Sequence, residues 1–253
     1  MRVLFLGNNW LGWQILRWLK EQREEIVGVV IHPPKRRRYG DELVAEAAGL
    51  PVVDGSRLRE RAVLDSIREL DCEIAVSILF GYILPPEFLA LPPAGCINLH
   101  PSLLPYNRGA HPNVWSIIDG TPAGTTLHYI DAGVDTGDII AQREVAIEPI
   151  DTGETLYRRL EHASLALFKE TWPAVRAGTA PRLKQGDAAG SCHHSSDVER
   201  IDEIDLEGTY KARDLINRMR ARTFAPYRGA YFQCDGRRVY VSLQLAFGDE
   251  AKS

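Results

Sequence analysis

The sequence contains little cysteine, and the cysteines it has follow no metal-ligand or disulfide pattern. Its 253 residues include four cysteines, Cys72, Cys96, Cys192 and Cys234, and no two of them form a Cys-x-x-Cys pair. This spacing predicts neither a zinc site nor a framework of disulfides, so no metal is expected. Reduced thiols in a cytoplasmic protein are the plainest interpretation.

Long apolar runs are absent as well. No stretch approaches the roughly 20 apolar residues that cross a bilayer. The apolar run at residues 3–6 is too short for the core of a signal peptide. The sequence therefore predicts no membrane partner.

An excess of positive charge is also lacking. The chain has 30 basic and 34 acidic residues and a net charge of -4. This balance gives no electrostatic reason to expect nucleic acid over the whole surface. One local exception is the run Lys35, Arg36, Arg37 and Arg38, which follows two prolines. We favour a solvated loop for this run, and the alternative is an anion-binding loop for phosphate.

Apolar residues make up 45% of the chain, which is enough for a sizeable core. The apolar patterns alternate between buried strands and amphipathic helices, and this predicts an α/β fold with a doubly wound, mostly parallel sheet. Composition changes near Gly178, so we expect a core over residues 1–178 and a small C-terminal region over 179–253. Strands are predicted at 3–6, 26–31, 51–53, 72–79, 94–99, 125–130, 139–147 and 238–243. Helices are predicted at 10–20, 41–48, 56–70, 113–119, 152–176, with a break near Pro173, and 206–222.

The loop after the first strand resembles a dinucleotide-binding turn only loosely. It lacks the Gly-x-Gly-x-x-Gly pattern, and no Walker lysine follows it, so a dinucleotide is not expected. Asn8, Asn9 and Trp10 instead lie at the carboxyl end of this strand, where ligands bind in such sheets. We predict that they line a substrate cleft.

The stretch 96–108 ends an apolar strand with an amide and an imidazole, Asn98 and His100. Residues two apart on a strand point to the same face, so both side chains can project into one cleft. A second stretch, 128–138, adds the carboxylate of Asp135 in a glycine-flanked loop. An amide, an imidazole and a carboxylate can together hold an oxyanion, move a proton and orient the imidazole. We therefore interpret these three residues as catalytic.

Each of the three also has a structural interpretation. Asn98 could cap a turn, His100 could be a structural histidine, and Asp135 could be an Asx-turn residue. Each structural interpretation is favoured for a residue taken singly, and catalysis is favoured for the three in this order. The role of His128 is left open. It is either a residue of the site or a strand histidine that is hydrogen-bonded to a neighbour. At the turn that follows the first motif, Leu104–Pro105 is predicted to be cis.

The two motifs resemble those of the folate-dependent formyltransferases. The first is Asn-x-His-Pro-Ser-Leu-Leu-Pro at residues 98–105, and the second is His-x-x-Asp-x-x-x-Asp-x-Gly-x-Ile at residues 128–139. The resemblance covers most of residues 1–178 and implies a Rossmann-like core. It also implies that a formyl group passes from 10-formyltetrahydrofolate to an amine, with Asn98, His100 and Asp135 as the catalytic residues. The residues that would hold the pterin are Ile78, Leu79, Phe80, Gly81, Tyr82, Ile83, Leu84, Asp131, Gly133 and Asp138.

Branches of this family differ in the amine that accepts the formyl group. Residues 216–232 resemble the tail of sugar N-formyltransferases, which act on nucleotide-linked amino sugars. The region after Gly178 is expected to be too short for the barrel of the initiator-tRNA branch, and too long for the glycinamide ribonucleotide branch. The implied acceptor is therefore a nucleotide-linked amino sugar, and the C-terminal region could form a homodimer interface. The residues predicted to contact this acceptor are Asn8, Asn9, Trp10, Tyr106, Asn107, Arg108 and Tyr227.

Alternatives outside this assignment stay open at this point. The core could be a glycinamide ribonucleotide or initiator-tRNA formyltransferase, a catalytically idle binding domain, or a hydrolase that releases formate from the same folate. The presence of all three catalytic residue types disfavours the idle domain. Formate release without an amine would indicate the hydrolase, and dependence on an amine would indicate a transferase.

Overall fold

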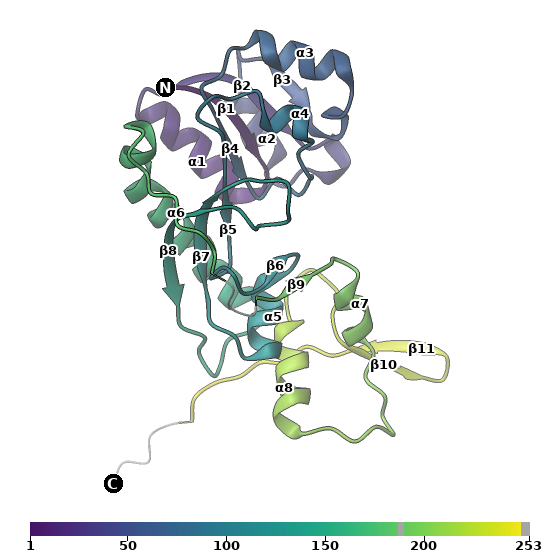
Figure 1. Cartoon of the computed structure of the whole chain (residues 1–253). Helices are drawn as coiled ribbons and strands as arrows, with labels where there is room; N and C mark the ends of the chain where they lie inside the picture. Colours follow the sequence, from purple (N-terminus) through teal and green to yellow (C-terminus); the bar gives the residue numbers. More distant parts are fainter. Residues whose placement is uncertain (187–189, 249–253) are drawn as a thin grey trace. The chain divides into compact units, whose positions relative to one another are not determined.

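The computed structural model describes residues 1–186 and 190–248, and its largest element is a seven-stranded sheet (Figure 1). In spatial order the strands are β3 (Val52–Asp54), β2 (Glu25–Ile31), β1 (Arg2–Gly7), β4 (Ile74–Ile78), β5 (Cys96–His100), β7 (Ala123–Tyr129) and β8 (Ile139–Val145). The five strands from β3 to β5 pair in parallel, and β7 runs antiparallel to β5. The predicted doubly wound, mostly parallel α/β fold is confirmed.

The strand order reverses between β1 and β4. From β1 the chain adds β2 and β3 on one side and then returns to place β4 and β5 on the other. Ligands bind at the carboxyl ends of the strands beside such a reversal. The backbone N–H of Asn8 donates to the carbonyl of Ile78 over 3.2 Å, so the loops that follow β1 and β4 begin side by side.

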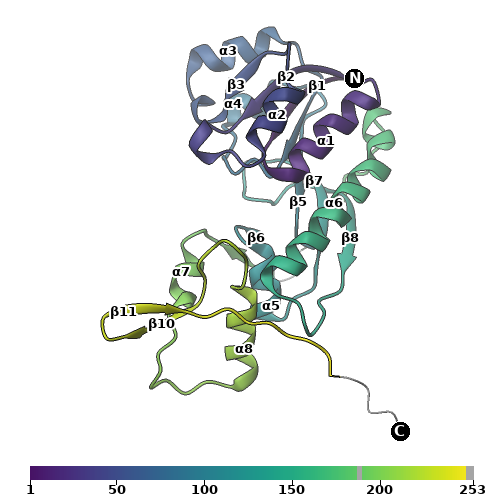
Figure 2. The same ribbon diagram turned by 180° about the vertical axis from the view of Figure 1, so that it is seen from behind.

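Alternating side chains divide the interior into two layers. Phe5 and Ile97 pack with α1 (Asn9–Glu21), α2 (Gly40–Glu46) and the C-terminal part of α6 (Gly153–Arg176). Leu6 and Cys96 pack with α3 (Arg61–Glu69) and α4 (Pro86–Leu89). Because sides alternate along a strand, Asn98 shares the face of Cys96. Figure 2 shows α1 and α2 in front of the sheet. Short 3-10 turns lie at Pro34–Arg36 and Gly55–Arg57.

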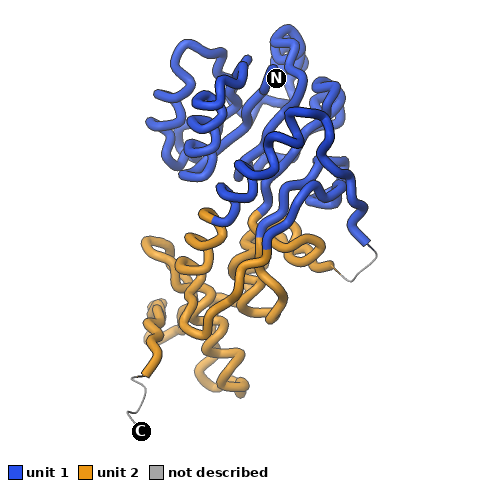
Figure 3. Tube along the Cα trace, turned by 90° about the vertical axis from the view of Figure 1, so that its left-hand side faces the viewer, with its two compact units in different colours: residues 1–100, 125–143, 163–186 blue, residues 101–124, 144–162, 187–253 orange. Residues whose placement is uncertain are grey.

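The chain divides into two compact units, which Figure 3 colours separately. The first comprises residues 1–100, 125–143 and 163–186, and the second comprises residues 101–124, 144–162 and 187–253. The sequence predicted one boundary near Gly178, with everything before it in the core. In the structure, residues 101–124 and 144–162 belong to the same unit as the C-terminal residues. The second unit contains α5 (Pro112–Asp119), α7 (Asp197–Asp202), α8 (Ala212–Ala221), the pair β6 (Arg108–Gly109) and β9 (Cys192–His193), and the pair β10 (Tyr231–Cys234) and β11 (Arg237–Tyr240).

The C-terminal elements differ from their predictions. The helix expected over 206–222 begins only at Ala212, because residues 205–210 form a turn in which the hydroxyl of Tyr210 accepts the backbone N–H of Asp205. The strand expected over 238–243 is present as β11, over Arg237–Tyr240, and it pairs with β10 in a hairpin. The helix α7 and the pair β6–β9 were not predicted.

Two local predictions concern prolines, at Pro105 and at Pro173. The predicted cis bond at Leu104–Pro105 is confirmed. The break predicted near Pro173 is wrong, because α6 continues through this proline to Arg176. None of the helices within residues 1–186 and 190–248 combines the length and the hydrophobicity of a transmembrane span.

Candidate active site

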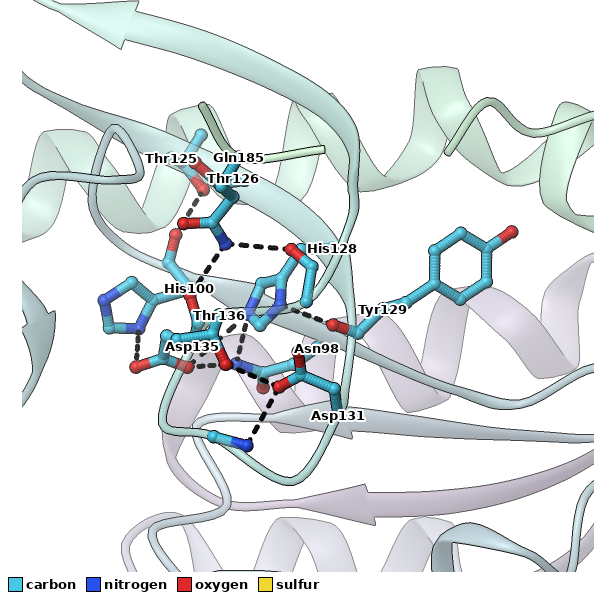
Figure 4. Close-up of polar contacts among 12 residues, drawn as sticks. Asn98, His100, Thr125, Thr126, His128, Tyr129, Asp131, Asp135, Thr136 and Gln185 are labelled. Atoms are coloured by element: carbon cyan, nitrogen blue, oxygen red, sulfur yellow. Dashed lines mark hydrogen bonds and ion pairs between the residues drawn. The ribbon is translucent and has the colours of Figure 1, made fainter. Parts of the chain in front are cut away.

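Three polar side chains lie together on one face of the sheet. Asn98 and His100 come from β5, and the antiparallel register places Asn98 directly opposite His128 of β7. Directly opposed residues of an antiparallel pair share a face. The predicted alternation of Asn98 and His100 thus holds, and His128 completes the row (Figure 4).

The loop between β7 and β8 folds back over this face and brings Asp135 to the same place (Figure 4). One carboxylate oxygen, Oδ2, lies 3.5 Å from Nδ1 of His100. The other, Oδ1, accepts from Nδ2 of Asn98 over 3.3 Å and lies 3.5 Å from Nε2 of His128. The structure therefore brings the three predicted catalytic residues together and adds His128 to them.

His128 orients the amide of Asn98. Its Nδ1 lies 2.8 Å from the carbonyl oxygen of Tyr129, which can only accept, so Nδ1 carries a hydrogen. In that tautomer Nε2 is an acceptor, and Nδ2 of Asn98 donates to it over 3.2 Å. The NH2 group of Asn98 therefore faces two acceptors, which fixes which end of the amide points toward His128 and Asp135. His128 is thus a strand histidine bonded to its neighbours, and a part for it in the chemistry stays a prediction.

The backbone of the Asp135 loop is held in an unusual conformation. Asp135 has a φ of +54°, in the left-handed region that few residues other than glycine adopt. Asp131, predicted to hold the pterin, also stabilises this loop, since its Oδ1 accepts from the Gly133 N–H at 3.0 Å and the Thr136 hydroxyl at 2.6 Å. Asp138, another predicted pterin contact, forms an ion pair with Lys184 over 2.9 Å.

The site is shielded from water, which strengthens its electrostatic interactions. His100 and His128 are buried, and the side chain of Asp135 is 14% exposed. Cys96, on the same strand, is buried too, and burial raises the pKa of its thiol to about 12. This thiol stays protonated and is a poor nucleophile. Cys96 is therefore no candidate nucleophile beside the amide, the imidazoles and the carboxylate.

The predicted pterin loop follows β4 and mixes packed and exposed side chains. Phe80 and Leu84 are buried in the layer of α3 and α4, whereas Ile83 is 69% exposed. Leu79 has a φ of +51°, which turns the chain sharply after Ile78. Gly81 is exposed, and Tyr82 packs edge-on against Phe80 with ring centroids 5.5 Å apart. The exposed Ile83 and Gly81 are accessible to a ligand, and the role of this loop in holding the pterin stays a prediction.

Asn8 holds the basic loop in place and is itself buried. Its Oδ1 accepts from the backbone N–H of Arg38 at 2.9 Å, and its Nδ2 donates to the carbonyl of Arg36 at 3.4 Å. Asn8 is therefore a support for residues 36–38 rather than an exposed substrate contact. Asn9 and Trp10, at the start of α1, remain half-buried. In the basic run, Lys35, Arg36 and Arg38 are exposed and Arg37 is half-buried, as expected for a solvated loop.

His32 lies beneath this loop, and the residue is 8% exposed. Its Nδ1 contacts Nδ2 of Asn8 at 3.4 Å, and its ring packs against Phe80 and Tyr82. Its Nε2 has no hydrogen-bond partner within the described ranges. Burial, the largest cause, lowers the pKa of His32 from its ordinary value of 6.5.

We expect His32 to make folding less favourable as the pH falls below 6.5. The unfolded chain then takes up a proton at His32 that the folded state does not bind until its lower pKa is reached, so protons favour unfolding. His32→Gln, which cannot titrate, should show a shallower loss of unfolding free energy between neutral and mildly acidic pH. Denaturant titrations at several pH values measure this, with exposed His162→Gln as the matched control. Equal slopes in wild type and His32→Gln would contradict the expectation.

The remaining predicted acceptor contacts belong to the second unit, and one of them is internal. Asn107 is fully buried, and its Nδ2 donates to the hydroxyls of Ser116 at 2.9 Å and Thr121 at 2.8 Å. Its Oδ1 accepts from the hydroxyl of Ser191 at 2.9 Å. A side chain bonded on all sides cannot contact a substrate, so we correct Asn107 to a structural residue.

The other three acceptor candidates are accessible. Tyr106 and Arg108 are half-buried. The backbone N–H of Arg108 donates to the carbonyl of Ser191 at 2.9 Å, beside the β6–β9 pair. Tyr227 is 50% exposed and lies edge-on to Phe224, with ring centroids 5.3 Å apart. An exposed tyrosine of this kind retains a face that can stack on a base.

Most of the chain matches a known family. Residues 1–171 match the family described as Formyl transferase. The chain belongs to the formyl transferase family. The resemblance carried by the two motifs is thus confirmed at the level of the family, and so is the enzyme class, an N-formyltransferase. Formyltransferases of this family take their formyl group from a formyl-tetrahydrofolate. Residues 197–246 match a second family, described as the N-formyltransferase dimerization C-terminal domain.

Individual relatives within the formyl transferase family point to two acceptors. The methionyl-tRNA formyltransferase of Geotalea daltonii is 35% identical over 98% of this chain and 81% of that protein. The structure of a sugar N-formyltransferase from Shewanella sp. FDAARGOS_354 is similar with a TM-score of 0.84 and 25% identity, over 98% of this chain and 99% of that one. The formyltransferase PseJ of Anoxybacillus kamchatkensis, solved with UDP-4,6-dideoxy-4-formamido-L-AltNAc and tetrahydrofolate, is 32% identical with a TM-score of 0.60, over 79% and 89% of the two chains.

Proposed function

We propose that this protein transfers a formyl group from 10-formyltetrahydrofolate to the amine of a nucleotide-linked amino sugar. The observation that carries the chemical part is the cluster of Asn98, His100 and Asp135 on one shielded face of the sheet. The acceptor rests on the similarity of the whole chain to a sugar N-formyltransferase structure, and on the match of its C-terminal residues to the N-formyltransferase dimerization domain.

The reaction exchanges one carbon–nitrogen bond for another. The neutral amine of the sugar attacks the formyl carbon, and the formyl oxygen becomes an oxyanion. When the oxyanion collapses, the bond between the formyl carbon and N10 of the folate breaks. The sugar nitrogen loses one proton and N10 gains one, so the products are a formamide and tetrahydrofolate.

His100 and Asp135 suit the proton transfers. Nδ1 of His100 faces the carboxylate at 3.5 Å, which leaves Nε2 as the nitrogen that meets the substrate. A protonated His100 can donate its Nε2–H to the oxyanion, and the negative charge of Asp135 favours that protonated form. The carboxylate can also accept the proton that leaves the amine, directly or through water.

Asn98 adds a second donor for the oxyanion. Its two amide hydrogens point toward Asp135 at 3.3 Å and His128 at 3.2 Å. Both distances are long for an N–H donor, so the amide is oriented without being tightly bound. A developing oxyanion is a stronger acceptor than either partner and can draw one of these hydrogens to itself.

A second candidate function is the formylation of initiator methionyl-tRNA, and a sequence similarity supports it. The methionyl-tRNA formyltransferase of Geotalea daltonii shares 35% identity over nearly the whole chain. Against it stands the match of residues 197–246 to a dimerization domain, which supports a homodimer formed through the C-terminal region. The PseJ structure, solved with a UDP-linked sugar, supports a diphosphate sugar as the acceptor class.

A panel of acceptors tests the proposal. The enzyme is incubated with 10-formyltetrahydrofolate and UDP-, dTDP- and GDP-linked amino sugars, with methionyl initiator tRNA, or with no amine. We expect one amino sugar to give a kcat/KM at least about a hundredfold above that of the tRNA, because a site built for one acceptor rejects another strongly. Faster formation of formylmethionyl-tRNA would establish the second candidate instead. Formate released without any amine would identify a hydrolase.

A further inference from the structure

The segment 182–185, which follows α6, lies along the start of β8. Leu183 and Ile139 form an antiparallel bridge with two hydrogen bonds, from the N–H of Ile139 to the carbonyl of Leu183 at 2.7 Å and back at 3.0 Å. Leu183 is 59% exposed, so burial of its side chain does not explain why the segment lies here. The backbone pairing itself positions the segment.

This bridge determines what the next two residues meet. In an antiparallel pair, each step forward on one chain is a step back on the other. Lys184 therefore lies opposite Asp138, and the two form an ion pair at 2.9 Å. Gln185 lies opposite Gly137, at the end of the loop that carries Asp135. Residues 181–186 are otherwise exposed, and only Gln185 is half-buried.

The side-chain amide of Gln185 binds the backbone of that loop twice. Nε2 donates to the carbonyl oxygen of Asp135 at 2.8 Å and to that of Gly137 at 2.8 Å (Figure 4). Both distances are typical of a well-formed hydrogen bond. The two carbonyl groups belong to the residues on either side of Thr136. One amide group is therefore hydrogen-bonded to the loop backbone at Asp135 itself and two residues beyond it.

We infer that Gln185 is a positioning residue, which holds Asp135 in its left-handed conformation and thereby keeps its carboxylate against His100 and Asn98. This inference rests on the proposed function, because it gives Asp135 a catalytic task. A backbone at a φ of +54° is costly for an aspartate, and it persists only where the surroundings support it. The two hydrogen bonds from Gln185 supply part of that support.

Two substitutions separate this role from simple packing. Gln185→Ala removes both donors at every pH. Gln185→Glu keeps the shape of the side chain, but its ionised carboxylate faces two carbonyl oxygens and repels the loop. When that carboxylate takes up a proton, it regains one donor. The activity of Gln185→Glu relative to wild type should therefore rise as the pH falls, whereas the relative activity of Gln185→Ala should stay flat.

Steady-state kinetics with the accepted amine test the expected loss. We expect kcat to fall about 10- to 100-fold in Gln185→Ala, with the acceptor KM nearly unchanged, because a misplaced catalytic group slows chemistry more than binding. Gln22→Glu, at an exposed site on the same unit, should retain activity within about twofold. A kcat within twofold of wild type in Gln185→Ala, or a flat pH dependence of the Gln185→Glu ratio, would overturn the inference.

Hydrogen exchange gives a readout that does not need turnover. In both Gln185 variants the backbone amides of residues 131–138 should exchange faster than in wild type, and those of Gln22→Glu should not. Unchanged exchange in the two Gln185 variants would overturn the positioning role. If wild type formylates no amine while the exchange rises as expected, the proposed function fails and the role of Gln185 in holding the loop stands.

Discussion

Asp135→Asn should lower kcat by about 10²- to 10⁴-fold, the range over which a general acid–base group acts. The substitution keeps the size of the side chain and removes the charge that faces His100 and Asn98. Asparagine tolerates the left-handed backbone as well as aspartate does, so the loop should keep its course and the melting temperature should change little. Steady-state kinetics and thermal melts on the same preparations measure both.

A second aspartate provides a matched control. Asp71 has a φ of +48°, belongs to the same unit and is exposed, so Asp71→Asn makes the same chemical change away from the site. It should leave kcat unaltered. Asn98→Ala and His100→Ala should each reduce turnover comparably to Asp135→Asn, because the three act as a unit. Near-wild-type turnover in two of the three variants would remove the catalytic assignment.

Asn98 and His100 could be placed from the sequence because a local rule suffices. Two residues apart on an apolar strand share a face, and the register of β5 against β7 bears this out. Asp135 is different, since nothing local states that the loop after β7 folds back over the sheet. Its approach to His100 depends on β5 and β7 being neighbours, which only the structure shows.

Polar residues that support the fold were harder to tell from those that meet a ligand. Asn107 follows the catalytic motif directly, yet tertiary packing buries it among Ser116, Thr121 and Ser191. Asn8 was assigned to the acceptor for its place after β1, and it proves to hold the basic loop. An asparagine in a loop carries the same local signal in both roles, and only its partners decide.

The contact of Gln185 with the Asp135 loop could not be predicted from the sequence. It depends on the bridge between Ile139 and Leu183, which are far apart in the sequence. The hairpin β10–β11 did carry a local signal. Asp235 and Gly236 form a two-residue turn, each with positive φ, which is the strongest short-range hairpin signal known. Only the second strand was predicted, because the residues before the turn, Tyr231–Cys234, alternate too weakly to indicate a strand.

Gly137→Ala should disable the enzyme almost as strongly as the loss of Asp135. Gly137 is buried, and a Cβ added there would overlap the carbonyl oxygen of Tyr129 in β7. The obstacle is backbone, not the tip of a flexible side chain, so the loop must move away from the strand. A shift of about 1 Å at a catalytic group can cost about 10²-fold in rate. We also expect a loss of stability of about 1–3 kcal/mol, as for other overpacked sites.

Kinetics and thermal melts of Gly137→Ala, with Gly186→Ala as its partner, measure this effect. Among the residues that the structure describes, none comes within 4 Å of a Cβ placed at Gly186, so alanine there should leave both kcat and stability unchanged. The amide of Gln185 donates to the carbonyl oxygen of Gly137, so a displacement of Gly137 should also weaken this hydrogen bond. If Gly137→Ala turned over normally, the loop would be able to yield without moving Asp135. The carboxylate would then be placed by its own contacts with Asn98 and His100, and the grip of Gln185 would be dispensable.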